Sequence, residues 1–409
     1  MSATSLTGPP TRRAPRMGRG RQRTVFRAIQ IGAPVLLAAA ALATPGFVSV
    51  PSFYATVTTM SYIGCIALGM TVITLSGNIM SFSLAVTTTA TTVVFVWLLN
   101  RFGIVPAVIL ALAFGGAASG LQGIVIGWFR SNPIIVSIAA LSLVTGVFQA
   151  LTGGETLYPT ANASLALLKA RIFGVPFEFV AFLAMLAVAQ GILSFTVFGR
   201  NLMLVGDSLG AAEAVGILSW RTVSGAYILA GLFAAVSGIV LAGRFSEGNM
   251  QFAQGYDYGA IAAVLVGGTA IQGGSGSALR TLAGILFITV VQVLLLLHGL
   301  NLQWQYFNLG VIVLVVIMLQ TSSTSAAAAT QVLPGTRLRD PHLRPLGLLV
   351  ATLLFLVVID GGHGRILTGA TAYSALQTFA TLGLVTLGLG LTMIGGEFDL
   401  SVAGTFGMA

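Results

Sequence analysis

Few side chains in this sequence have the types and spacing that catalysis requires. The histidines, His298, His342 and His363, are scattered without paired ligands, and no Ser, His and Asp residues form a set that predicts a shared nucleophilic site. The only lysine, Lys169, lacks the Gly-x-x-x-x-Gly-Lys-Ser/Thr frame of a phosphate loop. The only cysteine, Cys65, excludes a disulfide framework or a Cys-based metal site within the chain. We therefore expect a protein that is not an enzyme and holds no cofactor or metal of its own.

A polar, Ala/Gly-rich stretch over residues 199–217, set between two long apolar runs, has the composition of a protein-contact loop. We expect a short helix that begins near Gly206, with Asp207 at or near its N-cap. Its small side chains suit a cleft in a partner, and Glu213 is its one obvious ionic group. The alternative is an ordinary surface helix between two spans. The residues that we single out here are Gly199, Arg200, Gly206, Asp207, Ala211, Ala212, Glu213 and Gly216.

A second motif occurs in two related forms, Ser-Gly-Asn-Ile-Met-Ser-Phe-Ser-Leu-Ala over residues 76–85 and Gly-Glu-Phe-Asp-Leu-Ser-Val-Ala over residues 396–403. Glycines such as Gly77 and Gly396 allow a turn or a close helix contact. Acids in an apolar segment face a cavity or a partner, or they cap a helix, and both interpretations stay open for Glu397 and Asp399.

Two more motifs contain residues that predict a helix start and a membrane-interface anchor. In Arg-Ser-Asn-Pro-Ile-Ile-Val-Ser, residues 130–137, we expect Asn132 as an N-cap and Pro133 in the first helical turn, where its missing N–H costs nothing. The block 255–277 contains two glycine pairs. We expect Tyr256 as a membrane-interface anchor near the outer mouth. Asp257 is expected at the same outer mouth, where it could contact a binding protein or a polar solute, and its role stays open.

Composition places these motifs in a bilayer. Hydrophobic residues make up 56% of the chain and charged residues only 7%, with a mean hydropathy of +0.97, which excludes a water-soluble globule. The net charge of +9 does not indicate nucleic acid, because seven of the nineteen basic residues crowd the arm 1–30, just before an apolar segment. We interpret this arm as a signal for membrane topology.

The apolar runs predict an all-α, polytopic membrane protein, since about 20 apolar residues cross about 30 Å of hydrocarbon. The eighth of ten runs is too short to cross alone, and its glycine pairs indicate a broken or re-entrant element buried in protein. The spans lie near residues 31–50, 55–76, 80–100, 105–128, 132–152, 175–197, 221–243, 259–272, 279–299 and 305–320.

Charge distribution predicts the orientation. With the arm in the cytoplasm, fourteen of the nineteen basic residues lie inside and five outside, as the positive-inside rule requires. The same topology puts residues 199–220 in the cytoplasm and 154–174 outside.

The chain then begins to repeat itself. A domain of ten predicted spans over 31–320 is followed by a Ser/Thr/Ala-rich cytoplasmic linker, 321–344, and by a new apolar run over 345–409. Residues 68–73 match 389–394 at an offset of 321 residues. We expect the first two or three helices of an incomplete second copy, as in a fragment of a tandem fusion. The alternative is a chance match of two Gly/Leu/Thr-rich helices.

These motifs, in this order, resemble the ribose-type permeases of bacterial ABC importers. The loop 199–217 is similar to the segment that seats on the ATP-hydrolysing subunit in that family. The first copy has Met80 about where the family has an aspartate, and Asp399 stands at that place in the second copy. The residues similar to the family signatures are Gly77, Asn78, Ser81, Pro133, Gly267, Gly268, Thr269, Gly273, Gly274, Gly396, Asp399 and Ser401.

The resemblance implies a multi-pass permease of the bacterial inner membrane that moves a sugar or a similar small polar solute. It also implies cytoplasmic ATP-binding subunits that hold ATP-Mg, an extracytoplasmic solute-binding protein and a second permease domain, fused or as a dimer. The alternatives are a secondary transporter or channel and a non-transporting scaffold. Polar side chains that could line a path are Thr71, Ser83, Thr87 and Gln149.

Overall fold

The computed structural model describes residues 39, 41–78, 80–160, 165, 166, 168–172 and 174–323, with four isolated positions further on, 368, 373, 377 and 386. The chain divides into two units, Met1–Ser325 and Ala326–Ala409, and the elements below all belong to the first. The arm 1–30, most of the expected first span, nearly all of the linker and the second-copy residues Gly396, Asp399 and Ser401 lie outside the described residues.

In the described part of the first unit the regular elements are helices, apart from a hairpin with two residues in each strand and one isolated bridge, which confirms the all-α prediction. Strands β1 (Arg171–Ile172) and β2 (Val175–Pro176) pair antiparallel. The helices are α2 Val50–Leu75, α3 Leu84–Phe102, α4 Ile104–Phe129, α5 Pro133–Thr152, α6 Phe177–Phe195, α7 Val197–Asp207, α8 Leu209–Ala214, α9 Ser219–Phe245, α10 Tyr256–Val266, α11 Ala278–Leu297 and α12 Leu302–Ser323.

Within the described residues, seven helices are long and apolar enough to cross a membrane: α2 to α6, α9 and α11. They correspond to the second to seventh and the ninth predicted spans. The apolar part of α12 is shorter, and α10 has 11 residues. At 1.5 Å per residue, α10 extends about 16 Å, roughly half of the hydrocarbon thickness. The expected broken element is therefore confirmed.

Local signals explain where these helices begin. The side chain of Ser49 accepts a hydrogen bond from the Ser52 amide at the start of α2, and that of Ser277 accepts from the Arg280 amide at the start of α11. The Asn132 side chain caps α5 by accepting from the Ile134 amide at 2.9 Å, directly before Pro133. Both of these predicted roles at the start of α5 are confirmed.

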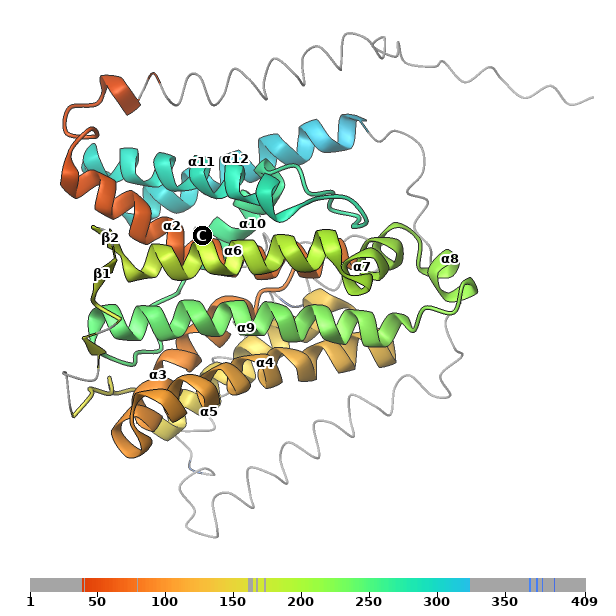
Figure 1. The fold of residues 1–409 in the computed structure, drawn as a ribbon, viewed down its shortest axis with the longest axis horizontal. Helices are drawn as coiled ribbons and strands as arrows, with labels where there is room; N and C mark the ends of the chain where they lie inside the picture. Colours follow the sequence, from red (N-terminus) through yellow and green to blue (C-terminus); the bar gives the residue numbers. More distant parts are fainter. Residues whose placement is uncertain are drawn as a thin grey trace, which may run out of the picture. The chain divides into compact units, whose positions relative to one another are not determined.

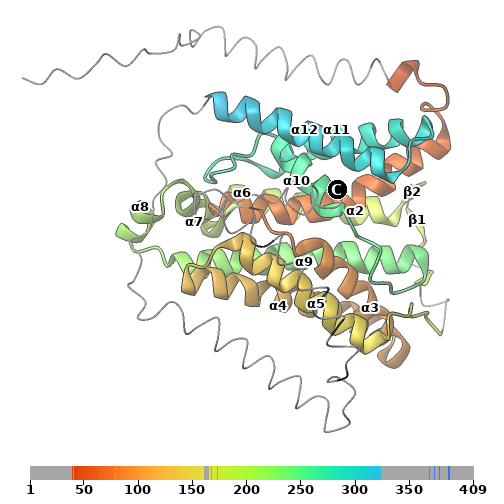
Figure 2. The same cartoon turned by 180° about the vertical axis from the view of Figure 1, so that it is seen from behind.

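Helices α2 and α9 form the centre of the unit. Figures 1 and 2 show α10, α11 and α12 on one side of α2, and α3 and α4 next to α9, while α5 packs against α3 and α4. Helix α9 packs closely on α4, because glycines let the backbones approach: a Cβ on Gly231 would overlap the Gly115 carbonyl. Helix α5 has one buried residue, Ser137, and several of its large apolar side chains are exposed: Ile135, Leu143, Val147 and Leu151.

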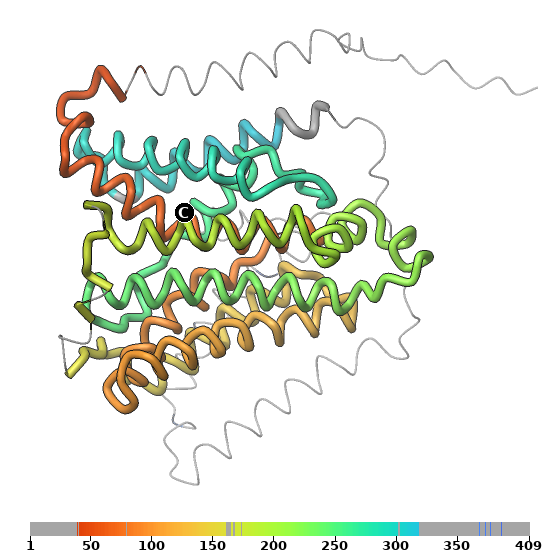
Figure 3. Tube along the Cα trace, in the orientation of Figure 1, coloured from red at the N-terminus to blue at the C-terminus, as the bar shows by residue number. Residues whose placement is uncertain are grey.

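The trace in Figure 3 places the two ends of the bundle. Helices α7 and α8 lie at one end, and the β1–β2 hairpin lies at the other. This is the arrangement that the predicted topology requires, with residues 199–220 and 154–174 on opposite sides of a membrane.

Candidate functional site

Residues 196–217 fold into two short helices. The Thr196 hydroxyl oxygen accepts from the Gly199 amide at 3.1 Å and caps α7. The Ser208 side chain accepts from the Ala211 amide at 3.4 Å and caps α8. The predicted short helix is present as α8, which begins at Leu209, three residues after Gly206, and its N-cap is Ser208, directly after Asp207. Gly206 and Asp207 end α7, because the chain becomes extended at Ser208.

Helix α8 and its flanks form a mostly exposed surface. Within α8 only Ala212 is buried, while Ala211 and Glu213 are exposed, as is Arg200 on α7. Gly216 ends this surface at a φ of +84°, which favours glycine. Apolar side chains that reach solvent here are Leu204, Leu209, Val215 and Leu218. Exposed apolar groups beside small residues are typical of a protein interface.

Glu213 is held inside the chain. Its carboxylate accepts two hydrogen bonds from Arg130 Nη2, at 2.7 and 3.0 Å, and one from the Ser219 hydroxyl at 2.7 Å. The hydrogen bond from Ser219, together with Arg130, lowers the pKa of Glu213 below its usual value. The predicted ionic handle is thus paired, and it fixes α8 to the end of α4 and the start of α9. Sequence reasoning missed Arg130, whose partner is 83 residues away.

Glycines from three separate motifs meet beside this surface. A Cβ on Gly206 would overlap the Leu75 carbonyl oxygen and the Gly274 nitrogen, and it would lie 3.0 Å from the Gly77 nitrogen. The Gly274 amide donates to the Leu75 carbonyl at 3.2 Å. Gly77, Gly273 and Gly274 have positive φ values. These contacts join α7, the end of α2 and the loop between α10 and α11 into one junction, and they confirm the close contact expected of Gly77.

The other signature residues have structural places too. Gly267 ends α10 against the Arg280 backbone, and Gly268 follows it at a φ of +79°. Thr269 is fully buried, and its hydroxyl has no hydrogen-bond partner among the residues that the structure describes. Asn78 donates to the Ser76 hydroxyl at 2.7 Å.

Asp257 lies deep in the bundle. Its side chain is buried, and Oδ1 accepts from the Ala85 amide at 2.9 Å, so it caps α3 from α10. Gly259, one half-turn further on, lies against Ile63, halfway along α2. Asp257 is therefore not placed at an outer mouth, and Tyr256 packs half-buried against the core rather than at an exposed end. Helices α3 and α10 both begin inside the bundle, with their N-termini close together.

The candidate path residues do not converge. Ser83 donates to Gln122 Oε1 at 2.5 Å and contacts the Ser81 hydroxyl at 2.9 Å. The Thr71 hydroxyl contacts that of Thr281 at 2.7 Å, and Thr87 donates to the Ser83 carbonyl. Ser83, Thr71 and Thr87 are buried, whereas Gln149 is exposed on α5. In this conformation the Thr71 and Ser83 hydroxyls join different helices, whereas the Thr87 hydroxyl bonds the backbone at the start of its own helix.

Comparison with known proteins identifies the family of this chain. Residues 52–319 match the family described as "Branched-chain amino acid transport system / permease component". The chain is 30% identical over 215 residues to the autoinducer 2 import system permease protein LsrC of Enterobacter sp. (strain 638), covering 53% of this chain and 63% of that protein.

Two further relatives agree. Identity is 32% over 203 residues to LsrC of Klebsiella pneumoniae (49% of this chain, 59% of that protein). It is 35% over 185 residues to the probable ABC transporter permease protein YphD of Escherichia coli (45% and 56%). The chain thus spans less than two thirds of the length of these relatives. No solved structure matches it significantly.

Proposed function

Because the chain belongs to the family of permease components of branched-chain amino acid transport systems, we propose that it is the membrane permease of a bacterial ABC importer. Its solute is a sugar or a similar small polar molecule. Relatives named as the permease of an autoinducer 2 import system and as a probable ABC transporter permease support this assignment. It is a multi-pass inner-membrane protein, and its N-terminus is cytoplasmic.

One observation carries the proposal. The α7–α8 segment presents an exposed, small-residue surface that is braced by an ion pair and joined through the glycine junction to α2 and to the α10–α11 loop. A cytoplasmic ATP-binding subunit that seats on α8 therefore acts directly on helices of the membrane domain. Subunits that bind the inward and outward states differently shift the equilibrium between them.

The proposal includes three kinds of partner. ATP-binding subunits hold ATP-Mg and supply the energy, and a solute-binding protein delivers the solute to the outer face. A second permease domain completes the path. The outward-facing α5 is available to such a domain or to lipid.

Reconstitution tests this function. The full chain is placed in vesicles with ATP-binding subunits and a solute-binding protein from the same genome, and uptake of labelled ribose and of other small polar solutes is measured with and without ATP. We expect uptake of at least one solute that requires ATP hydrolysis. Uptake driven by an ion gradient without ATP would establish a secondary transporter instead.

A further inference from the structure

A cavity of about 290 Å³ lies at the end of the bundle opposite α8. The start of α2, the β1–β2 hairpin, the start of α6 and the end of α9 contribute its lining, which includes Tyr54, Thr58, Arg171, Glu178 and Arg244. In the predicted topology this is the outer face. The volume is at the lower end of the range for ligand pockets, about 300–1,000 Å³, which suits a small solute.

The cationic wall of this cavity is held in place. The Arg171 guanidinium lies over the Tyr54 ring, 4.6 Å from its centroid. The Tyr54 hydroxyl in turn donates to the Gly174 carbonyl at 2.8 Å, which ties the hairpin to α2. The position of Arg171 is thus fixed before any ligand arrives.

Glu178 is the unusual member of the lining. Its side chain is 1% exposed, and its Oε1 atom accepts no hydrogen bond within the described residues. The Nε atom of Arg244 lies 3.8 Å away, beyond hydrogen-bond distance. The N-terminus of α6 stabilises the negative charge, but it leaves this oxygen without a donor. Buried polar atoms normally have a hydrogen-bond partner, so we expect a ligand in the cavity to donate a hydrogen bond to Glu178 Oε1.

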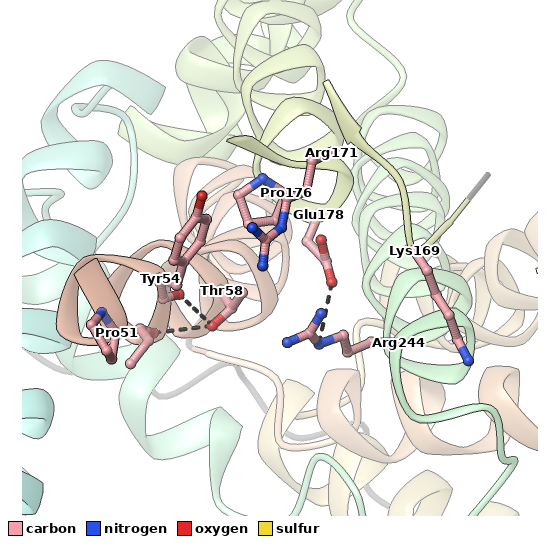
Figure 4. A pocket seen from close by; sticks show the side chains of 9 residues that line it. Pro51, Tyr54, Thr58, Lys169, Arg171, Pro176, Glu178 and Arg244 are labelled. Carbon is pink, nitrogen blue, oxygen red and sulfur yellow. Dashed lines mark hydrogen bonds and ion pairs between the residues drawn. The ribbon is translucent and has the colours of Figure 1, made fainter. Parts of the chain in front are cut away.

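The cavity also has excess positive charge. Figure 4 shows the Glu178 carboxylate between the guanidinium groups of Arg171 and Arg244, while the Lys169 amino group points away from it. Among the described residues, Arg171 pairs with no carboxylate. Two guanidinium groups favour an anion, and Glu178 repels any anion that brings no donor for it.

We propose that this cavity binds a small hydroxylated anion, of which a polyol carboxylate is the simplest form. The ligand carboxylate accepts hydrogen bonds from Arg171 and Arg244, and a ligand hydroxyl donates to Glu178 Oε1. This inference rests on the proposed function, since it makes the cavity an outer recognition site for an acidic solute of the permease.

Three probes test separately whether binding requires the negative charge and the hydroxyl groups of the ligand. The full chain in phosphatidylcholine nanodiscs is titrated with labelled gluconate, and sorbitol and hexanoate are used as competitors. Sorbitol has the hydroxyls without the charge, and hexanoate has the charge without the hydroxyls. We expect saturable gluconate binding, with each competitor at least about tenfold weaker.

Variants locate the binding. Arg171→Gln should weaken gluconate binding about tenfold or more. Glu178→Gln should weaken gluconate binding and strengthen hexanoate binding, so that the preference between them collapses. Arg101→Gln is the matched control, because Arg101 lies over the Trp97 ring at the end of α3, outside the cavity lining, and we expect no change.

Several results would overturn the inference: no saturable binding, equal competition by sorbitol or hexanoate, or the same loss in Arg101→Gln as in Arg171→Gln. ATP-dependent uptake of a neutral sugar, measured with the same purified chain in the reconstituted vesicles described above, separates the two proposals. If that uptake persists while gluconate does not bind, the cavity assignment is wrong and the permease function stands.

Discussion

At the scale of the residue, Glu213 acts as a brace for α8. Its carboxylate joins Arg130 at the end of α4 to Ser219 at the start of α9, so α8 is fixed in orientation while its other residues, apart from the buried Ala212, stay exposed. Because the carboxylate of Glu213 is already paired within the chain, we expect it to orient the α8 surface rather than to form an ion pair with the partner subunit.

Exchanging the two charges tests this brace. We expect Glu213→Gln and Arg130→Gln each to reduce solute-stimulated ATPase activity roughly two- to fivefold, the effect of losing one half-exposed ion pair. The double variant Arg130→Glu with Glu213→Arg should recover much of the loss, because the pair can reform. If the exchanged pair is as impaired as the single variants, Glu213 contacts the partner directly.

Acid should remove the contribution of Glu213 to stability. A carboxyl group whose pKa is lowered in the folded state stabilises that state above its unfolded pKa, and the contribution is lost as pH falls through the folded value. We therefore expect the melting temperature of the wild type to exceed that of Glu213→Gln at pH 7, with the difference closing below about pH 4.5. A difference that is constant down to pH 3.5 would contradict the assignment.

The sequence predicts the structural role of a residue when its hydrogen-bond partner is close along the chain. Asn132 is recognisable as a cap because its donor is two residues away. The partner of Glu213 is 83 residues away, and that of Asp257 is 172 residues away, so both contacts depend on the packing of helices. Nothing local in the sequence predicts the surroundings of Glu178, since Arg244 comes from the end of α9, 66 residues away.

At the scale of the element, the glycine junction is the point where α7 meets the membrane helices. We expect Gly206→Ala to destabilise the protein by about 1–3 kcal/mol or more, since the new Cβ would overlap backbone atoms of Leu75 and Gly274. Melting temperature in detergent measures the effect. Gly210→Ala is the control: nothing lies within 4 Å of its Cβ position, and alanine favours helix α8. Equal melting temperatures for the two variants would contradict a tight junction.

The start of α3 depends on a cap supplied by another helix. Asp257→Ala leaves the buried Ala85 amide without its acceptor, and we expect a loss of about 1–3 kcal/mol. Asp257→Asn keeps a carbonyl oxygen at this place and should lose less. Thermal unfolding of both variants checks the order, and an asparagine variant as unstable as the alanine variant would show that the charge, and not the hydrogen bond, matters.

Hydropathy predicts long spans well, because the length of α4 or α9 follows from the thickness of a bilayer. It also identifies α10 as too short. It does not predict the division of residues 196–217 into α7 and α8, since that break depends on Ser208 becoming extended where the glycine junction fixes the end of α7.

At the scale of the whole molecule, the described unit has two functional ends. One carries the exposed α8 surface, and the other carries the β1–β2 hairpin and its cationic cavity. Charge bias along the sequence predicts which end is cytoplasmic. The expected second copy over 345–409 remains a prediction, because its signature residues lie outside the described part of the chain.

Site-specific photocrosslinking in cells tests most directly that α8 seats an ATP-hydrolysing subunit. A benzoylphenylalanine is placed at Ala211 on α8 or, as the control, at the exposed Tyr158 near the outer end, and adducts are identified by mass spectrometry. We expect an adduct with an ATP-binding subunit from position 211 and none from position 158. The absence of that adduct at 211, with the subunit present and the variant folded, would contradict it.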